Sequence, residues 1–315
     1  MKSKPTTAIV VKAASAQVPA GAPEIDQKIV FMWVAQKSAN TQLAYLADYA
    51  RFAAQVGKPL DQINLEDLLK FDAWLKSLGI EDSSRKRTLS AVKSLFVFAM
   101  KNFPAYIPLN PAAGLLVPKP KDSLNERILT EEQVVKLIDA AKDNPRDHLL
   151  LRMLYFTGTR IEEVVGLGWR DCNAAAGKDA AAGFLTIYGK RSKTRVVRVE
   201  DPLWSDLMKI YKDCAFGRVF IFAGEVPNTH LSKSRGWGIV KAAARRAGLS
   251  DRVSPHFLRH SIATHMIDHG ASLFDVQIFL GHESAETTKR YIHSRPTISA
   301  DSFLRRPLSH SDDRA

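Results

Sequence analysis

The stretch Pro255-His256-Phe257-Leu258-Arg259-His260, continued through His265, carries an imidazole and a guanidinium three residues apart. Residues with this spacing lie side by side on a helix, so a helix here places His256 next to Arg259. Considered singly, a histidine near a helix start is more often structural than catalytic, and an arginine is most often a salt-bridge partner. The pair therefore has to be interpreted together with the rest of the chain.

Three further signals accompany this pair. Downstream, Leu280-Gly281-His282 comes nine residues before Tyr291. Upstream, Thr157-Gly158-Thr159-Arg160 is a helix-breaking turn followed at once by a helical pattern, which places Arg160 at a junction rather than on a solvated face. Between them, Lys190 belongs to a short basic run. Each signal alone has an ordinary structural explanation.

The basic run has the pattern of a hairpin tip. Phe184 to Tyr188 and Val196 to Val199 are rich in β-forming residues, and residues 189–194 connect them. Within that connection Lys190 directly follows Gly189, and Lys193 is its rival three residues along. We expect a β-hairpin that presents one of these two lysines.

The same half of the chain also predicts helices. Residues 146–156 have the apolar content of a buried helix, and Thr130 with Gln133 has the spacing of a capping box at the start of another. Helical patterns return after residue 201. We therefore expect a mixed domain in which helices surround a small sheet.

The first half of the chain predicts helices throughout residues 24–103. Asn64 can cap one of them, and a further helix starts near Ser83 or Ser84. This gives a small bundle of about four helices. Arg85, Lys86 and Arg87 open the last helix, where three adjacent cations oppose the helix dipole. They are either a solvated charged end or a phosphate contact, and in so basic a chain we favour the contact.

Proline density marks the boundary between the two halves. Five prolines fall within residues 104–123, which cannot form one helix and are expected to be a linker. The predicted organisation is a disordered tail at residues 1–23, a helical domain at 24–118, a second domain at 119–293 and a C-terminal tail at 294–315.

Composition limits the class of protein. The formal net charge of +12 suggests a polyanionic partner, most simply nucleic acid, although many soluble proteins are basic. No apolar run approaches the length of a membrane helix, and the two cysteines, Cys172 and Cys214, are expected to be buried free thiols, which fits the cytoplasm. We find no metal-ligand spacing and no phosphate-cradling glycine loop, so no cofactor is expected.

Together, the ordered set of Arg160, Lys190, His256 with Arg259, His282 and Tyr291 resembles the tyrosine recombinase, or phage integrase, family. The match covers about residues 124–293, and the helical half resembles more loosely the core-binding domain of that family, as in Xer-like two-domain site-specific recombinases. The resemblance implies a mainly α fold with a small β-sheet: an N-terminal helical, SAM-like core-binding bundle and an α+β catalytic domain.

The resemblance also implies the role of each residue. Tyr291 would attack the DNA phosphate and His256 would take its proton, while Lys190 would protonate the leaving 5′ oxygen. Arg160 and Arg259 would stabilise the negative charge on the phosphate, and His282 would donate a hydrogen bond to it. From the residues alone, only the suitability of these groups follows. Glu163 is expected to orient Arg160 or its neighbours, and His260 and His265 are expected to be structural.

The resemblance implies partners as well: a double-stranded DNA recombination site, and a homo-tetramer that holds two such sites. The C-terminal tail would then be a segment for exchange between subunits. Three alternatives stay open at this point, namely a type IB topoisomerase, a non-catalytic DNA-binding protein of the same fold, and a helical transcription factor. The last would leave the residues around Tyr291 unexplained. The compact plan favours a resolvase-like or transposon-type enzyme.

Overall fold

The computed structural model describes residues 23–119, 125–175, 181–189, 194–213 and 219–281. The chain divides into two compact units, Met1–Lys121 and Asp122–Ala315, and the division falls inside the proline-containing segment 104–123. Across the described ranges, no helix has both the length and the apolar character that a membrane crossing would require.

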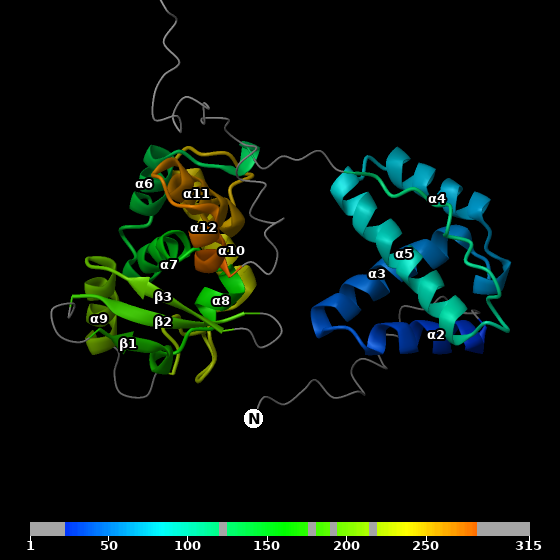
Figure 1. The fold of residues 1–315 in the computed structure, drawn as a ribbon, viewed down its shortest axis with the longest axis horizontal. Coiled ribbons are helices and arrows are strands. Elements are labelled where there is room, and N and C mark those ends of the chain that lie inside the picture. Colours follow the sequence, from blue (N-terminus) through cyan, green and yellow to red (C-terminus); the bar gives the residue numbers. More distant parts are fainter. Residues whose placement is uncertain (1–22, 120–124, 176–180, 190–193, 214–218, 282–315) are drawn as a thin grey trace, which may run out of the picture. The chain divides into compact units, whose positions relative to one another are not determined.

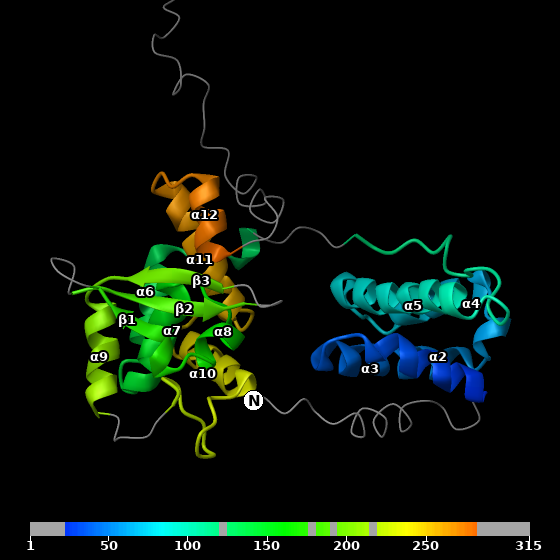
Figure 2. The same ribbon diagram turned by 60° about the horizontal axis from the view of Figure 1, so that its bottom comes forward.

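The first unit is a helical bundle. Over residues 23–119 its helices are α2 (Glu24–Ala35), α3 (Ala39–Val56), α4 (Leu65–Ser77) and α5 (Asp82–Asn102), with a short 3-10 turn at Leu60–Gln62. Figure 2 shows α4 and α5 in one layer, with α2 and α3 in the other. The predicted four-helix arrangement is confirmed, and α5 begins one residue before the earlier of the two predicted starts.

Local signals in the bundle behave as the sequence predicts. The Asn64 side chain accepts a hydrogen bond from the Asp67 amide, and the Asp67 carboxylate accepts one from the Asn64 amide, which together form a capping box. The core is aromatic and aliphatic, with Phe52, Phe71 and Phe96 fully buried and packed edge to face. This core holds α5, whose first two turns carry the Arg85-Lys86-Arg87 triplet.

The second unit begins with helices. After a 3-10 turn at Asn125–Arg127 come α6 (Glu131–Asp139), α7 (Pro145–Phe156) and the short α8 (Ile161–Val165). The predicted capping box at the start of α6 is present, with Thr130 and Gln133 each bonding the other's backbone amide. The predicted buried helix is α7, whose Leu150, Leu151 and Leu154 are inaccessible to solvent.

A small antiparallel sheet follows. The strands β1 (Cys172–Ala174), β2 (Gly183–Tyr188) and β3 (Thr194–Val199) lie in that order, and a 3-10 turn at Trp169–Asp171 precedes them. The predicted hairpin is β2 with β3, paired so that Leu185 faces Val197. The sequence prediction missed β1, because three residues are too few to show an alternating pattern. Cys172 in this strand is a free, half-buried thiol, and Cys214 lies outside the described residues.

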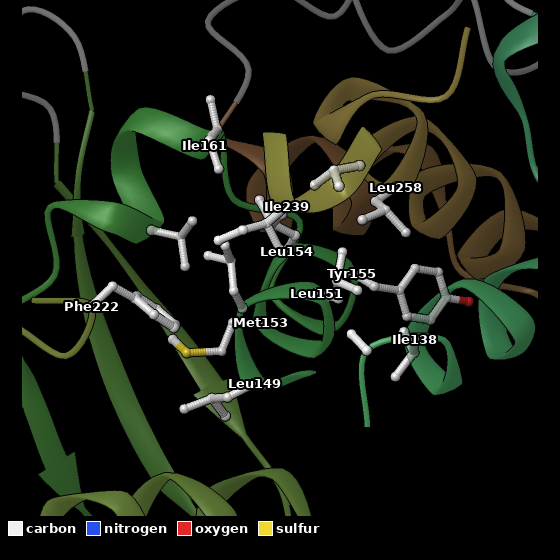
Figure 3. Packing of buried hydrophobic residues seen from close by; sticks show 14 of the residues in the cluster. Ile138, Leu149, Leu151, Met153, Leu154, Tyr155, Ile161, Phe222, Ile239 and Leu258 are labelled. Atoms are coloured by element: carbon white, nitrogen blue, oxygen red, sulfur yellow. The ribbon is translucent and has the colours of Figure 1, made fainter. Parts of the chain in front are cut away.

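Within the described residues, four helices follow the sheet: α9 (Leu203–Asp213), α10 (Lys233–Arg246), α11 (Pro255–Asp268) and α12 (Leu273–Leu280). Figure 1 labels these helices and the sheet of the same unit. Helix α11 packs on α7 and α12, and α10 packs on α8. Figure 3 shows the centre of this core, where Met153 and Leu154 of α7 lie among Phe222, Ile239 of α10 and Leu258 of α11. The mainly α fold with a small β-sheet is thus confirmed.

Candidate active site

The turn between α7 and α8 is packed without spare room. Gly158 has a φ of 56°, and a Cβ at this position would lie 2.7 Å from Phe279 Cε1 and 2.8 Å from Leu280 Cδ2. Thr157 and Thr159 on either side are fully buried, and their hydroxyl oxygens lie 2.9 Å apart in a hydrogen bond. Only glycine fits the central position, and the turn is thereby fixed against the end of α12.

Arg259 also holds this turn against the end of α12. Its side chain is buried, and it donates hydrogen bonds to the Gly158 carbonyl and, at 2.7 Å, to the Leu280 carbonyl. A buried guanidinium needs such acceptors, because burying a charge without partners is costly. Arg259 therefore joins the turn that precedes Arg160 to the end of α12, one residue before Gly281.

Arg160 stands at the start of α8, held by a carboxylate. Its backbone amide donates to Glu163 Oε2 at 3.0 Å, and its guanidinium Nη1 donates to Glu163 Oε1 at 2.8 Å. The side chain of Arg160 remains 35% exposed, whereas that of Glu163 is 6% exposed. Glu163 thus orients Arg160, as the sequence analysis expected, and leaves part of that side chain open to a ligand.

A second arginine, which the sequence analysis did not identify, binds the same carboxylate. Arg195 at the start of β3 donates from Nη2 to Glu163 Oε2 at 2.9 Å, and its side chain is 13% exposed. A signal was available in the sequence: Arg195 has the same parity along the strand as Val197 and Val199, which are buried. An arginine on the inward face of a strand requires an acid inside the fold.

The two arginines determine the charge of Glu163. Burial by itself raises the pKa of this carboxyl, but the hydrogen bonds and positive charges of Arg195 and Arg160 outweigh burial and hold the pKa below its ordinary value. Glu163 is therefore ionised at neutral pH and holds both guanidiniums as a fixed anion.

His256 lies in the first turn of α11, the same helix that carries Arg259 three residues further on. Partial burial, followed by the positive charges of Arg259 and Arg160, holds the pKa of His256 below its ordinary value. The imidazole keeps access to solvent and its ring lies 6.3 Å from that of Trp237. A neutral, accessible imidazole beside two guanidiniums can accept a proton at neutral pH.

His265, further along α11, has a packing role, as expected. It is buried, and its Nδ1 lies 2.8 Å from the hydroxyl of Tyr155 in a hydrogen bond that joins α11 to α7. Among the described residues, no three His, Cys, Asp or Glu side chains gather in the way that a metal ion would need.

Three of the six predicted catalytic residues, Arg160, His256 and Arg259, are thus brought together. The other three, Lys190, His282 and Tyr291, lie outside the described residues, as do Lys193 and the tail at 294–315. The structure defines only the residues that precede them. Gly189 follows β2, and Gly281 ends α12 in the left-handed conformation with a φ of 65°.

The three cations at the start of α5, Arg85, Lys86 and Arg87, lie in different environments. Arg85 is 12% exposed and forms ion pairs with Asp72 at 2.9 Å and Asp82 at 2.7 Å. Arg87 pairs with the buried Asp48 at 3.0 Å but is 50% exposed, and Lys86 is exposed. Arg85 is therefore engaged within the bundle, while Lys86 and Arg87 face solvent.

Comparison with known proteins agrees with this arrangement. Residues 127–297 match the Phage integrase family, and residues 29–102 match the Phage integrase, N-terminal SAM-like domain. Tyrosine recombinase XerD of Chlorobaculum tepidum is 34% identical over 275 residues, covering 81% of this chain and 86% of the relative. Tyrosine recombinase XerA of Pyrococcus furiosus is 31% identical, covering 85% of this chain and 88% of the relative.

Solved structures share the fold. XerH site-specific recombinase bound to palindromic difH substrate has a TM-score of 0.67 at 19% identity, covering 91% of this chain and 90% of that one. A lambda integrase dimer bound to a COC' core site has a TM-score of 0.69 at 19% identity, covering 95% and 83%. The chain belongs to the phage integrase family and is a tyrosine-type site-specific DNA recombinase.

The packing at Gly158 gives a stability prediction. We expect Gly158→Ala to lower the free energy of unfolding by about 2 kcal/mol or more, because the methyl group meets Phe279 and Leu280 and the backbone has a positive φ. Urea unfolding followed by tryptophan fluorescence measures this. Gly238→Ala in α10 is the control: its Cβ meets open space, so the substitution should be neutral or stabilise by about 0.5 kcal/mol. Equal effects of the two substitutions would contradict the packing argument.

Proposed function

We propose that this recombinase cuts and rejoins DNA through a covalent 3′-phosphotyrosyl bond to Tyr291. The observation that carries the proposal is the cluster of Arg160, Arg259 and His256 on neighbouring turns, with Glu163 holding Arg160. The cluster lies in the part of the chain that matches the Phage integrase family, and Tyr291 falls within the same match.

The chemistry of this cluster suits attack on a phosphodiester. When the Tyr291 oxygen bonds to phosphorus, negative charge grows on the non-bridging oxygens, and guanidiniums stabilise it while remaining charged themselves. Arg160 is the more exposed of the two and is placed to bind an oxygen directly, while the buried Arg259 adds its charge from the side of α11. His282 donates a further hydrogen bond to the phosphate in this proposal.

Two protons move in the cleavage step. His256 accepts the proton of the Tyr291 hydroxyl, and Lys190 gives a proton to the 5′ oxygen as its bond to phosphorus breaks. The products are a 3′-phosphotyrosyl enzyme and a free 5′ hydroxyl. Rejoining reverses both transfers with a 5′ hydroxyl from the partner site, and the phosphotyrosyl bond conserves the energy, so no ATP or metal ion takes part.

The helical unit supplies DNA affinity in this proposal. We assign residues 24–118 as the core-binding domain, 119–293 as the catalytic domain and 104–123 as the linker. The N-terminal match to the SAM-like domain and the net charge of +12 support the assignment. Of the triplet, Lys86 and Arg87 are the better phosphate ligands, and Arg85 acts by supporting the start of α5.

Strand exchange between two duplexes needs four active sites, so we propose a homo-tetramer on two recombination sites, acting in the cytoplasm. A solved relative supports this assembly: a lambda integrase tetramer bound to a Holliday junction shares the fold with a TM-score of 0.68. In the tail at 294–315, Phe303 and Leu304 form a short apolar pair that suits docking on a neighbouring subunit.

Tyr291 provides the direct test. Nicked duplexes of random sequence, incubated with the protein and separated on a denaturing gel, trap a covalent adduct because the short fragment beyond the cut diffuses away. Sequencing the trapped strands gives the recombination site. We expect wild-type protein to form the adduct and Tyr291→Phe to form none, while the variant still shifts the selected site on a native gel. An adduct formed by Tyr291→Phe, or none formed by the wild type, would refute the proposal.

The pKa of His256 predicts the pH dependence of cleavage. A general base works when deprotonated, and the pKa of His256 is lowered from about 6.5, so the rate should hold down to about pH 6.5 and fall only in more acidic buffer. Rates of adduct formation across this range measure the profile. His256→Gln should be slow and lose the acidic fall, whereas His269→Gln, at the exposed end of α11, should keep both rate and profile. A rate already halved at about pH 7.5 would contradict a lowered pKa.

A substrate with a changed leaving group shows whether Lys190 or its rival Lys193 is the proton donor. A 5′-bridging phosphorothiolate leaves without a proton, because a thiolate is far more stable than an alkoxide. We expect Lys190→Ala to cleave ordinary DNA slowly and to cleave the phosphorothiolate at nearly the wild-type rate. Rescue of Lys193→Ala in place of Lys190→Ala would transfer the role to Lys193.

A further inference from the structure

Arg195 occupies a position on β3 that packing does not explain. It points inward from the sheet with Val197 and Val199, yet it carries a charge. Its neighbour on the opposite face of the same strand, Arg198, lies at the surface beside Glu200. The two arginines of β3 thus differ in burial while sharing strand, residue type and charge, which makes Arg198 a natural comparison.

Arg195 contacts two parts of the candidate active site. Its Nη2 donates to Glu163 Oε2 at 2.9 Å, the carboxylate that also holds Arg160. Its side chain also covers Gly281 at the end of α12: a Cβ on Gly281 would lie 3.0 Å from Arg195 Cδ and 3.5 Å from its Nη1. Arg195 is therefore the point where the hairpin, α8 and α12 meet.

Stability alone does not account for this residue. The Arg195 Nε is buried and has no hydrogen-bond partner among the described residues. A buried donor without a partner lowers stability, and replacement of a buried ion pair by apolar residues is often neutral or stabilising. A valine would continue the inward face of β3 at lower cost. The charge of Arg195 therefore points to a function.

Charge balance supplies that function. Glu163 contributes one negative charge beneath Arg160, and Arg195 contributes one positive charge to the same carboxylate. With Arg195 present, the three side chains together carry a single positive charge. Without it, Glu163 and Arg160 form a neutral pair, and Arg160 offers a phosphate much less electrostatic stabilisation.

We propose that Arg195 is a positioning residue that neutralises Glu163 and thereby leaves the charge of Arg160 available to the scissile phosphate. The inference rests on the proposed function, because it assigns Arg160 to that phosphate. On this proposal, Glu163 favours cleavage only when Arg195 is present. The carboxylate holds Arg160 in place, and Arg195 offsets the negative charge that would otherwise cancel that of Arg160.

The test uses full-length variants and the nicked duplex carrying the site that the wild-type protein selects. Arg195→Gln should slow adduct formation by about 100-fold, in the range for loss of one transition-state charge contact. The double variant Arg195→Gln with Glu163→Gln restores the single positive charge and should cleave about 10-fold faster than Arg195→Gln alone. Arg198→Gln is the matched control and should stay within about twofold of the wild type. Circular dichroism and native gel shift confirm folding and site binding of each variant.

A second substrate separates charge from structure. A methylphosphonate at the scissile position replaces one non-bridging oxygen by a methyl group, so the reacting group carries one negative charge less and Arg160 has less charge to stabilise. The defect of Arg195→Gln should shrink at least 10-fold on this substrate if Arg195 acts through charge. A purely structural defect would be equally large on both substrates.

The outcomes are distinct. Wild-type cleavage by Arg195→Gln, a double variant no faster than the single one, or a defect unchanged on the methylphosphonate each overturns the role of Arg195. Arg160→Gln is tested in parallel: if it cleaves at the wild-type rate, the assignment of Arg160 to the scissile phosphate fails and the role of Arg195 fails with it, whereas cleavage through Tyr291 is tested separately by Tyr291→Phe. If Arg160→Gln is inactive while Arg195→Gln is fully active, only the inference on Arg195 falls.

Discussion

One buried carboxylate organises the described part of the candidate site. Glu163 is 6% exposed and accepts from the Arg160 amide, the Arg160 guanidinium and the Arg195 guanidinium. An isolated carboxylate at this depth would be protonated, and an isolated arginine on the inward face of β3 would be costly. Each group is stable there only because the others are present, so the start of α8, the base of the hairpin and the orientation of Arg160 depend on one another.

The turn at Gly158 imposes a second constraint, of shape rather than charge. Its backbone approaches Phe279 and Leu280 so closely that no side chain fits, and its carbonyl accepts from Arg259. Arg160 follows this turn by two residues. The direction in which α8 starts, and hence the location of the Arg160–Glu163 pair, is therefore set by contact with α12. The guanidinium of Arg160 is therefore positioned by two separate features, the ion pairs of Glu163 and the close-packed turn at Gly158.

Much of this could be predicted from local sequence. The Thr130 and Asn64 caps, the α7 helix and the β2–β3 hairpin follow from short-range patterns, and the spacing of His256 and Arg259 requires a helix. What escaped prediction depends on contacts distant in sequence. Arg195 meets Glu163 across 32 residues: its parity along the strand distinguishes it from the exposed Arg198, but no local pattern identifies Glu163 as its partner. The strand β1 was missed for a different reason: its three residues are too few to show the alternating pattern of a strand. Arg85 looked like a phosphate ligand because its acid, Asp72, lies on another helix.

The two arginines of the site are held in different ways, and this difference has a consequence for the chain that follows α12. Arg160 is held by a side chain and remains 35% exposed, so a ligand can compete for its donors. Arg259 is buried and held by two backbone carbonyls, at Gly158 and Leu280. A carbonyl cannot be displaced without moving the backbone to which it belongs. The Leu280 carbonyl comes directly before Gly281, from which the chain continues to Tyr291, so a shift of that backbone acts on Arg259 and, through the turn at Gly158, on the start of α8. The start of α8, which carries the guanidinium that we propose binds the phosphate, and the end of α12, from which the chain leads to the proposed nucleophile, are therefore linked through the buried guanidinium of Arg259 as well as through the packing at Gly158.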